Sequence, residues 1–334
     1  MNKNISSGLN LEAFAGLKIG SSRKKWRFRA RSLRTLLRMG HCAPAVVQTL
    51  TDICGFEDEW PILAAAGLPG GIGDTGSECG GITSPLILLG MRYGLRDLRD
   101  GLPVIFDKGH DYFRQFEDRN HSPFCREIRG DSYRLSRCIK AVCSSPEIAS
   151  STFFQDGNKA IVGEKRQAYG LLYSHMAERG FHCAHRVFHR LSPAIPCSPE
   201  LLEASAAFLG GTLFKGLTCS AYAAGVMSIG LRIGEIEDSF PRVLRMIVLM
   251  KTGGNAFATH LNKFNRAMNL GNNLAQRFSA EFGDIQCQTI TGCDFSSLSA
   301  VNRYIETDGL ARCSDIADKV ADMVLSLWPA DQAR

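Results

Sequence analysis

The sequence lacks a long hydrophobic segment. Its longest apolar runs, such as VLRMIVLM at residues 243–250, are short and interrupted by Arg245, whereas a helix that spans a membrane needs about 20 apolar residues. The first twenty residues also lack the apolar core and the small-residue cleavage site of a secretion signal. We therefore expect a cytoplasmic protein without a membrane span.

Several catalytic and binding motifs are absent as well. The chain contains no C-x-x-C, which argues against thioredoxin-type and ferredoxin-type sites and against covalently attached c-type haem. No Ser-His-Asp arrangement and no pair of acids that recurs in both halves stands out, so the sequence gives no support for a hydrolase. Whether the protein is an enzyme is an open question at this point.

Acidic residues are missing from one basic stretch. Residues 23–38 contain eight Lys or Arg and no acid, while the whole chain has a mild formal net charge of +6. We interpret this stretch as the solvated face of a helix that turns Leu33, Leu36 and Leu37 inward, in preference to an RNA-binding or membrane-binding patch. No nucleic-acid partner is expected.

Cysteine is the residue type that is unusually frequent. The twelve cysteines lie at positions 42, 54, 79, 125, 138, 143, 183, 197, 219, 287, 293 and 313. A reducing cytoplasm disfavours structural disulfides, so a set this large indicates metal or redox chemistry. Any one of them taken alone is better explained as a small buried hydrophobe.

The chain contains an internal duplication. The triplet HCA occurs at residues 41–43 and 182–184, and each triplet is followed by a Gly-Gly pair, at 70–71 and 210–211. We expect two tandem, homologous domains, residues 1–150 and 151–334, joined by a linker at 144–158.

The same register continues to a cysteine in each half. Cys79 and Cys219 both lie eight residues after the second glycine of their pair. The next cysteine, however, follows after a longer interval in the second half than in the first. We place the extra residues within 255–278.

The apolar pattern predicts helices. Helical spacing of apolar residues runs through 46–53, 201–209 and 313–327, and residues 83–93 and 220–233 are apolar on nearly all sides, which is typical of buried helices. Alternating strand patterns are scarce. The fold class expected is therefore all-α.

The stretch GGIGDTGSECGG at residues 70–81 contains a literal G-x-G-x-x-G. A dinucleotide site needs a strand before these glycines, but the preceding PILAAAGLP looks helical, and the second copy, GGTLFKG, breaks the motif while keeping its distance to cysteine. We expect Gly70, Gly71 and Gly80 to let the backbone pass close to a bound cofactor. Cys79 and Cys219 then begin the next helices, where free N–H groups favour a thiolate.

These residues resemble one protein family. The order of Cys42, the glycine loop, CGGITSPLILLGMRYG at 79–94 and FCREIRG at 124–130 is similar to the redox-active proteins named for the pattern C…GCAxxG…C…C. A second, diverged copy runs through CSAYAAGVMSIGL at 219–231. Glu78 and Thr218 stand where the family motif has its first glycine.

The resemblance implies a small helical redox protein that transfers electrons to or from an unidentified partner protein. Four recurring cysteines per domain suggest an iron–sulfur cluster in each. Transferred residue by residue, the ligands are Cys42, Cys79, Cys125 and Cys143 in the first half and Cys183, Cys219, Cys287 and Cys313 in the second. Cys138 is the alternative to Cys143 as the fourth ligand.

Other chemistries fit the same residues. Four thiolates also suit zinc, and the pairs Cys138–Cys143 or Cys287–Cys293 could form a reversible disulfide. His185 and His189 could join Cys183 in holding a metal, although we favour surface positions for both. A non-catalytic helical module, with structural zinc or simply buried cysteines, is a further alternative, and a homodimer is possible.

Overall fold

The computed structural model describes residues 22–94, 101–130, 134–153, 182–236, 239–252 and 265–328. Within these ranges the chain is almost entirely helical, and its β-type pairing is limited to two isolated bridges, Glu78–Phe124 and Thr218–Gln286. The predicted all-α fold is confirmed. No helix in the described ranges has both the length and the apolar composition needed to cross a membrane.

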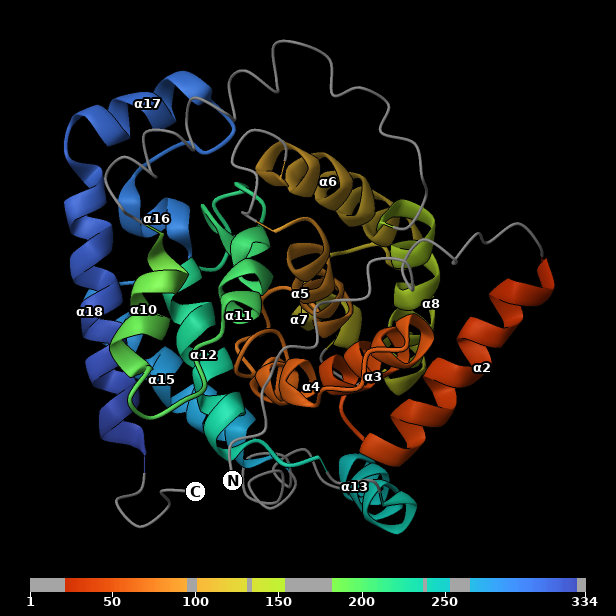
Figure 1. Cartoon of the computed structure of the whole chain (residues 1–334). Helices are drawn as coiled ribbons and strands as arrows, with labels where there is room; N and C mark the ends of the chain where they lie inside the picture. Colours follow the sequence, from red (N-terminus) through yellow and green to blue (C-terminus); the bar gives the residue numbers. More distant parts are fainter. Residues whose placement is uncertain are drawn as a thin grey trace.

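The helices of the first half are coloured from red to olive in Figure 1. They are α2 (Ser22–Met39), α3 (Cys42–Cys54), α4 (Trp60–Ala64), the 3₁₀ turn η1 (Ala65–Gly67), α5 (Gly80–Tyr93), α6 (Gly101–Asn120), α7 (Cys125–Arg129) and α8 (Leu135–Phe153).

The helices of the second half are coloured from green to blue. They are α10 (Cys183–Leu191), α11 (Pro199–Ala204), the 3₁₀ turn η2 (Ala206–Phe208), α12 (Ser220–Ile233), α13 (Phe240–Thr252), α15 (Arg266–Phe282), α16 (Cys287–Thr291), α17 (Leu298–Glu306) and α18 (Gly309–Leu327).

The two halves repeat the same series of helices. Helices α3, α4, α5, α6 and α7 correspond to α10, α11, α12, α15 and α16, and both α6 and α15 end five residues before the cysteine that opens the next helix. Because α15 is the counterpart of α6, the extra residues of the second half precede α15 and include α13. The insertion predicted within 255–278 was therefore placed too late in the sequence.

The linker predicted at 144–158 is also wrong where the structure describes it. Residues 144–153 form the last turns of α8, and Ser144 and Ser145 are buried there. Small serines allow close packing: the Ser145 hydroxyl lies 2.9 Å from that of Tyr112 in α6. Residues 154–158 lie outside the described ranges, and the domain boundary predicted after residue 150 falls inside α8.

The two halves share one hydrophobic core, to which both contribute buried side chains. Their contact is reciprocal, because α5 packs against α11 and α12 packs against α4. Gly90 of α5 lies against the carbonyl of Glu203, and Gly230 of α12 lies against the carbonyl of Leu63, which is the equivalent position. A Cβ atom would approach these oxygens to 2.4 and 2.3 Å, so both contacts require glycine.

A buried carboxylate joins the halves at the centre of this contact. Glu78 is fully buried, and its oxygens accept hydrogen bonds from Thr212 Oγ1 (2.6 Å), Thr218 N (3.2 Å) and Thr218 Oγ1 (2.5 Å). Glu78 and Thr218 occupy equivalent positions, directly before Cys79 and Cys219. The two places where this sequence departs from the family's first glycine therefore bind one another.

Replacing Gly90 by alanine should lower the free energy of unfolding by about 1–3 kcal/mol, because the new methyl group overpacks a rigid backbone contact. Chemical denaturation measures the change. Ala30→Gly at an exposed position of α2 is the control for helix propensity alone, which should cost about 1 kcal/mol. A Gly90→Ala variant more stable than the parent would contradict the close contact between the halves.

Candidate functional site: two groups of cysteines

Each half brings four cysteines together from four separate elements. In the first half, Cys42 opens α3, Cys79 caps α5, Cys125 opens α7 and Cys138 lies in the first turn of α8. The thiols lie close together, because Cys138 raises the pKa of the other three, and Cys42 and Cys125 also raise that of Cys79. We call these four residues the first cysteine group.

The structure places Cys138, and not Cys143, in this group. Cys138 borders the same cavity as Cys42 and Cys125, whereas the charged neighbour of Cys143 is Arg29 of α2. Five residues turn an α-helix by about 140°, so the two cysteines of α8 point in different directions. The choice of Cys143 as the fourth residue is therefore corrected, and a Cys138–Cys143 disulfide is disfavoured for the same reason.

Two backbone hydrogen bonds hold Cys79 beside Cys125. Cys79 N donates to the carbonyl of Pro123 (2.8 Å), and Cys125 N donates to the carbonyl of Ser77 (2.7 Å). The second half repeats this brace, since Cys219 N donates to Ile285 (2.8 Å) and Cys287 N donates to Leu217 (2.6 Å). The constant distance from the glycine pair to the cysteine is thus explained by a conserved local geometry in both copies.

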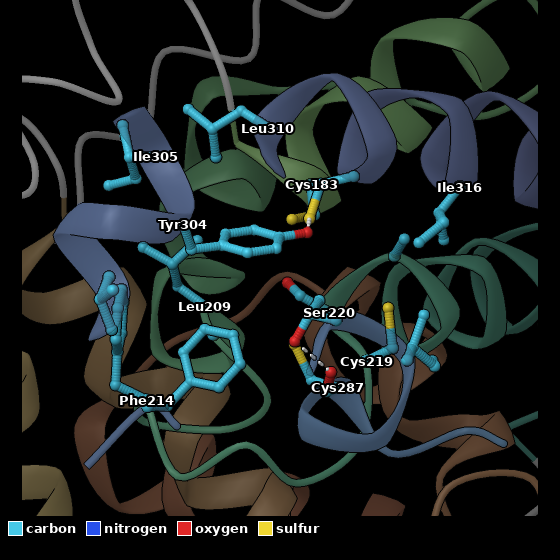
Figure 2. A pocket seen from close by; sticks show the side chains of 17 residues that line it. Cys183, Leu209, Phe214, Cys219, Ser220, Cys287, Tyr304, Ile305, Leu310 and Ile316 are labelled. Carbon is cyan, nitrogen blue, oxygen red and sulfur yellow. Dashed lines mark hydrogen bonds between the residues drawn. The ribbon is translucent and has the colours of Figure 1, made fainter. Parts of the chain in front are cut away.

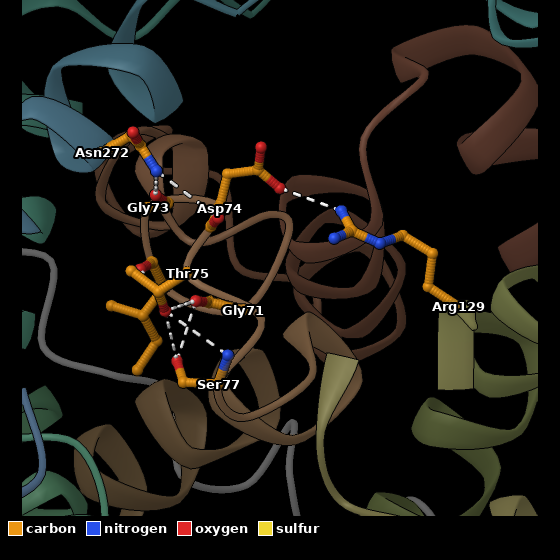
Figure 3. A network of polar contacts seen from close by, with 8 residues as sticks. Gly71, Gly73, Asp74, Thr75, Ser77, Arg129 and Asn272 are labelled. Atoms are coloured by element: carbon orange, nitrogen blue, oxygen red, sulfur yellow. Dashed lines mark hydrogen bonds and ion pairs between the residues drawn. The ribbon is translucent and has the colours of Figure 1, made fainter. Parts of the chain in front are cut away.

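The glycine loop makes a left-handed turn. Residues 70–74 all have positive φ angles, and so do residues 210–214, a conformation that costs non-glycine residues about 1–2 kcal/mol each. Side-chain hydrogen bonds stabilise the first turn, because Thr75 Oγ1 (2.5 Å) and Ser77 Oγ (2.8 Å) both donate to the Gly71 carbonyl (Figure 3). The glycines therefore serve the backbone path rather than a phosphate.

Of the three glycines predicted to contact a cofactor, Gly70 and Gly80 lie beside the first cysteine group. Gly70 borders the cavity, and a Cβ atom at Gly71 would lie 2.5 Å from the Ser77 amide. At Gly80 it would lie 2.7 Å from the sulfur of Cys42. Gly80 thus allows two helices to approach at a thiol, and the cofactor itself stays a prediction.

Burial controls the ionisation of the first cysteine group. It raises the pKa of Cys42 to about 11, and it also raises those of Cys79, Cys125 and Cys138, although the Arg129 guanidinium opposes the shift at the last two. The Gly81 amide donates to Cys79 Sγ at 3.4 Å, but desolvation and the neighbouring thiols outweigh it. The thiolate predicted at Cys79 is wrong, because burial favours the neutral thiol.

The second cysteine group consists of Cys183, Cys219, Cys287 and Cys313, the four residues predicted from the sequence. All four line one pocket with a cavity of about 40 Å³. Figure 2 shows the Tyr304 ring lying in this pocket, with its hydroxyl group directed towards Cys183. Burial raises the pKa of Cys219 to about 11, so the thiolate predicted there is wrong as well.

Cys313 differs from the other cysteines. A hydrogen bond from the Cys183 thiol is the main cause that lowers the pKa of Cys313 to about 7, and Tyr304, whose hydroxyl lies 3.3 Å from Cys313 Sγ, adds to the effect. The pKa of Cys183 is raised in turn. The interaction therefore favours the thiolate at Cys313 and the neutral thiol at Cys183.

Sequence reasoning missed Tyr304 and misjudged one histidine. Tyr304 lies on α17, a helix without a counterpart between α7 and α8, so the duplication could not point to it. His189 is exposed as predicted, but His185 is partly buried, stacks on His182 at a centroid distance of 3.9 Å and hydrogen-bonds the Leu202 carbonyl at 3.0 Å. Burial lowers the pKa of His185 to about 4.

A single metal ion does not fit the described residues as they lie. No three His, Cys, Asp or Glu side chains in the described ranges are placed to hold one, and a tetrahedral zinc site with Zn–S bonds of about 2.3 Å requires sulfurs about 4 Å apart. An iron–sulfur cluster, which cysteine thiolates also hold, stays a prediction.

Cys313 should react with an alkylating agent at a lower pH than any other cysteine of the two groups, with half-maximal rate near pH 7, because only the thiolate is nucleophilic. Mass-spectrometric mapping of iodoacetamide adducts against pH measures this. Tyr304→Phe removes a hydrogen-bond donor to the thiolate and should shift the Cys313 profile to higher pH. A profile unchanged by Tyr304→Phe would contradict the role of the tyrosine.

The comparisons with known proteins give one match. A sequence profile for the family described as "Putative redox-active protein (C_GCAxxG_C_C)" matches residues 40–152 and 181–327. Neither the curated proteins nor the solved structures contain a match. The two matched segments cover more than half of the chain and coincide with the repeated helices. The chain therefore belongs to the C_GCAxxG_C_C family of redox-active proteins, and it carries the family domain twice.

Proposed function

We propose that the protein carries out thiol–disulfide exchange through the pair Cys183 and Cys313. The observation that carries this proposal is the position of the two thiols in one small pocket, where each changes the ionisation of the other. Both residues are partly exposed, which the approach of an external disulfide requires. The family's description, "Putative redox-active protein", is in line with this proposal.

The exchange balances without a metal. The Cys313 thiolate attacks one sulfur of a substrate disulfide, forms a mixed disulfide and expels the first substrate thiolate. Cys183 then attacks the Cys313 sulfur and expels the second, while its thiol proton passes to a leaving thiolate. Two electrons move from the pair to the substrate, which leaves as one thiol and one thiolate, and the protein holds a Cys183–Cys313 disulfide.

Ion pairs on the surface fix the two helices that carry the pair. Arg186 of α10 binds Asp318 of α18 through two hydrogen bonds, from Nε (2.8 Å) and Nη2 (2.6 Å), and Arg190 binds Asp322 one turn further along at 2.5 Å. A two-pronged pair of this kind holds its partners in one orientation. The ion pairs therefore position Cys183 opposite Cys313 without touching either sulfur.

Equilibration in glutathione redox buffers should convert Cys183 and Cys313 into a disulfide. Differential alkylation and peptide mapping identify the linked cysteines and the midpoint of the transition. Cys183→Ser and Cys313→Ser should each abolish it, whereas Cys143→Ser, outside both groups, should not. A product that joins Cys287 to Cys293, or no disulfide at any ratio, would refute the proposal.

Arg186→Ala should make the disulfide about two- to fivefold less favourable relative to the dithiol, consistent with the modest energies of partly exposed ion pairs. Lys319→Ala is the matched control, because Lys319 follows Asp318 on α18 but pairs with Glu281 of α15 and Asp315 of α18, not with α10. Equal effects of the two variants would show that α10 and α18 are positioned by their apolar packing instead.

An iron–sulfur cluster with single-electron transfer is the second candidate. It is favoured by one observation, the convergence of four cysteines in each half on the same elements. Anaerobic purification with iron, zinc and acid-labile sulfide counts tests it. Matching iron and sulfide with visible charge-transfer bands support a cluster, whereas a colourless, metal-free protein with titratable thiols excludes it.

A further inference from the structure

Cys42, Cys125 and Cys138 of the first cysteine group border a larger cavity than that of the second group. This cavity, of about 150 Å³, is walled by apolar side chains of α2 and α8, among them Leu36, Ile139 and Val142. Its polar end is formed by Asp74 and Arg129, whose Oδ1 and Nη1 atoms lie 3.1 Å apart (Figure 3). The other titratable side chains of the lining are His41 and the thiols. The charges of Asp74 and Arg129 neutralise one another.

The second copy has lost this arrangement. Phe214 replaces Asp74 at the same left-handed position of the loop, since Gly70 lies against Asp74 just as Gly210 lies against the ring of Phe214. Thr291 replaces Arg129 at the end of the short helix that begins with the third cysteine. The phenyl ring lines the second pocket, and the space left there is about 40 Å³. Of the two copies, the first alone combines the larger cavity with the ion pair.

The inserted helix of the second half covers the cavity of the first. Figure 1 shows α13 beside the C-terminal end of α2, on the side of the molecule formed by the first half. Val243 and Met246 of α13 are buried against Gly40 and line the cavity. With Met268 they form a small hydrophobic cluster separate from the main core. Helix α13 is thus held over the cavity by its own hydrophobic contacts.

We propose that this cavity binds a small neutral organic molecule with an apolar ring or branched body and a single hydrogen-bonding head, of the size and chemistry of phenol. An apolar cavity of about 150 Å³ accommodates a benzene-sized molecule. The ion pair offers a donor and an acceptor to the head, and a charged ligand would add an unpaired charge to an already neutral site, which is costly. The inference does not depend on the Cys183–Cys313 exchange.

The experiment is a calorimetric titration of the purified full-length chain with phenol, and with benzoate as the charged comparison. Phenol should bind one site with a dissociation constant of about 0.1–1 mM, a range consistent with so small a ligand, and benzoate at least tenfold more weakly. Asp74→Phe copies the second half, which accepts a phenylalanine at this backbone position, and should weaken phenol binding at least tenfold. Phe214→Leu in the other pocket should leave it unchanged.

Two variants of α13 test whether this helix closes the cavity. Met246→Ala, on the inner face of α13, should weaken phenol binding about threefold or more, whereas Leu244→Ala, on its exposed face, should not. The absence of saturable binding up to 10-fold above the expected range, equal effects of the two α13 variants, or binding insensitive to Asp74→Phe would each overturn the proposal. So would a chain purified with stoichiometric iron that Cys138→Ser removes, because a cluster would then fill the cavity.

Discussion

The placement of both cysteine groups depends on one buried carboxylate and the contact that surrounds it. A buried polar group is costly unless it is hydrogen-bonded, and the Glu78 side chain obtains three hydrogen bonds from the other copy. Because Glu78 and Thr218 immediately precede Cys79 and Cys219, the same contact fixes the start of α5 and of α12. The reciprocal approach of Gly90 and Gly230 to the opposite copy then aligns these helices over their whole length.

The duplication and the helical class could be read from the sequence because they rest on spacing. Equal distances from the glycine pair to Cys79 and Cys219 reflect equal backbone paths, and seven of the eight cysteines assigned to the two groups do lie in them. The eighth could not be chosen in the same way. Cys138 and Cys143 are both on α8, and only the rotation of that helix against α3 and α7 decides which one faces Cys42.

Other features were beyond the sequence because they depend on packing between distant segments. The sequence around Ser144 and Ser145 predicts a linker. In the structure both serines lie in α8, where their small side chains let this helix approach α6. Tyr304 lies on a helix that has no counterpart among the described residues of the first copy, so the repeat could not indicate it. The thiolate predicted at Cys79 from its place at a helix N-terminus is also wrong. Desolvation by burial raises the pKa of this thiol by more than the helix N-terminus lowers it.

The reciprocal packing of the halves has a consequence for synthesis. Helix α5 is completed long before α11 exists, and α4 long before α12, so an emerging first copy exposes the apolar surfaces that its sister will later cover. Pairings between such distant segments form late, and unpaired apolar surface favours association with other chains. During translation the same apolar surface of the first copy can also bind a neighbouring nascent chain. Because the second copy is covalently linked to the first, its high effective concentration must favour the correct pairing within one chain.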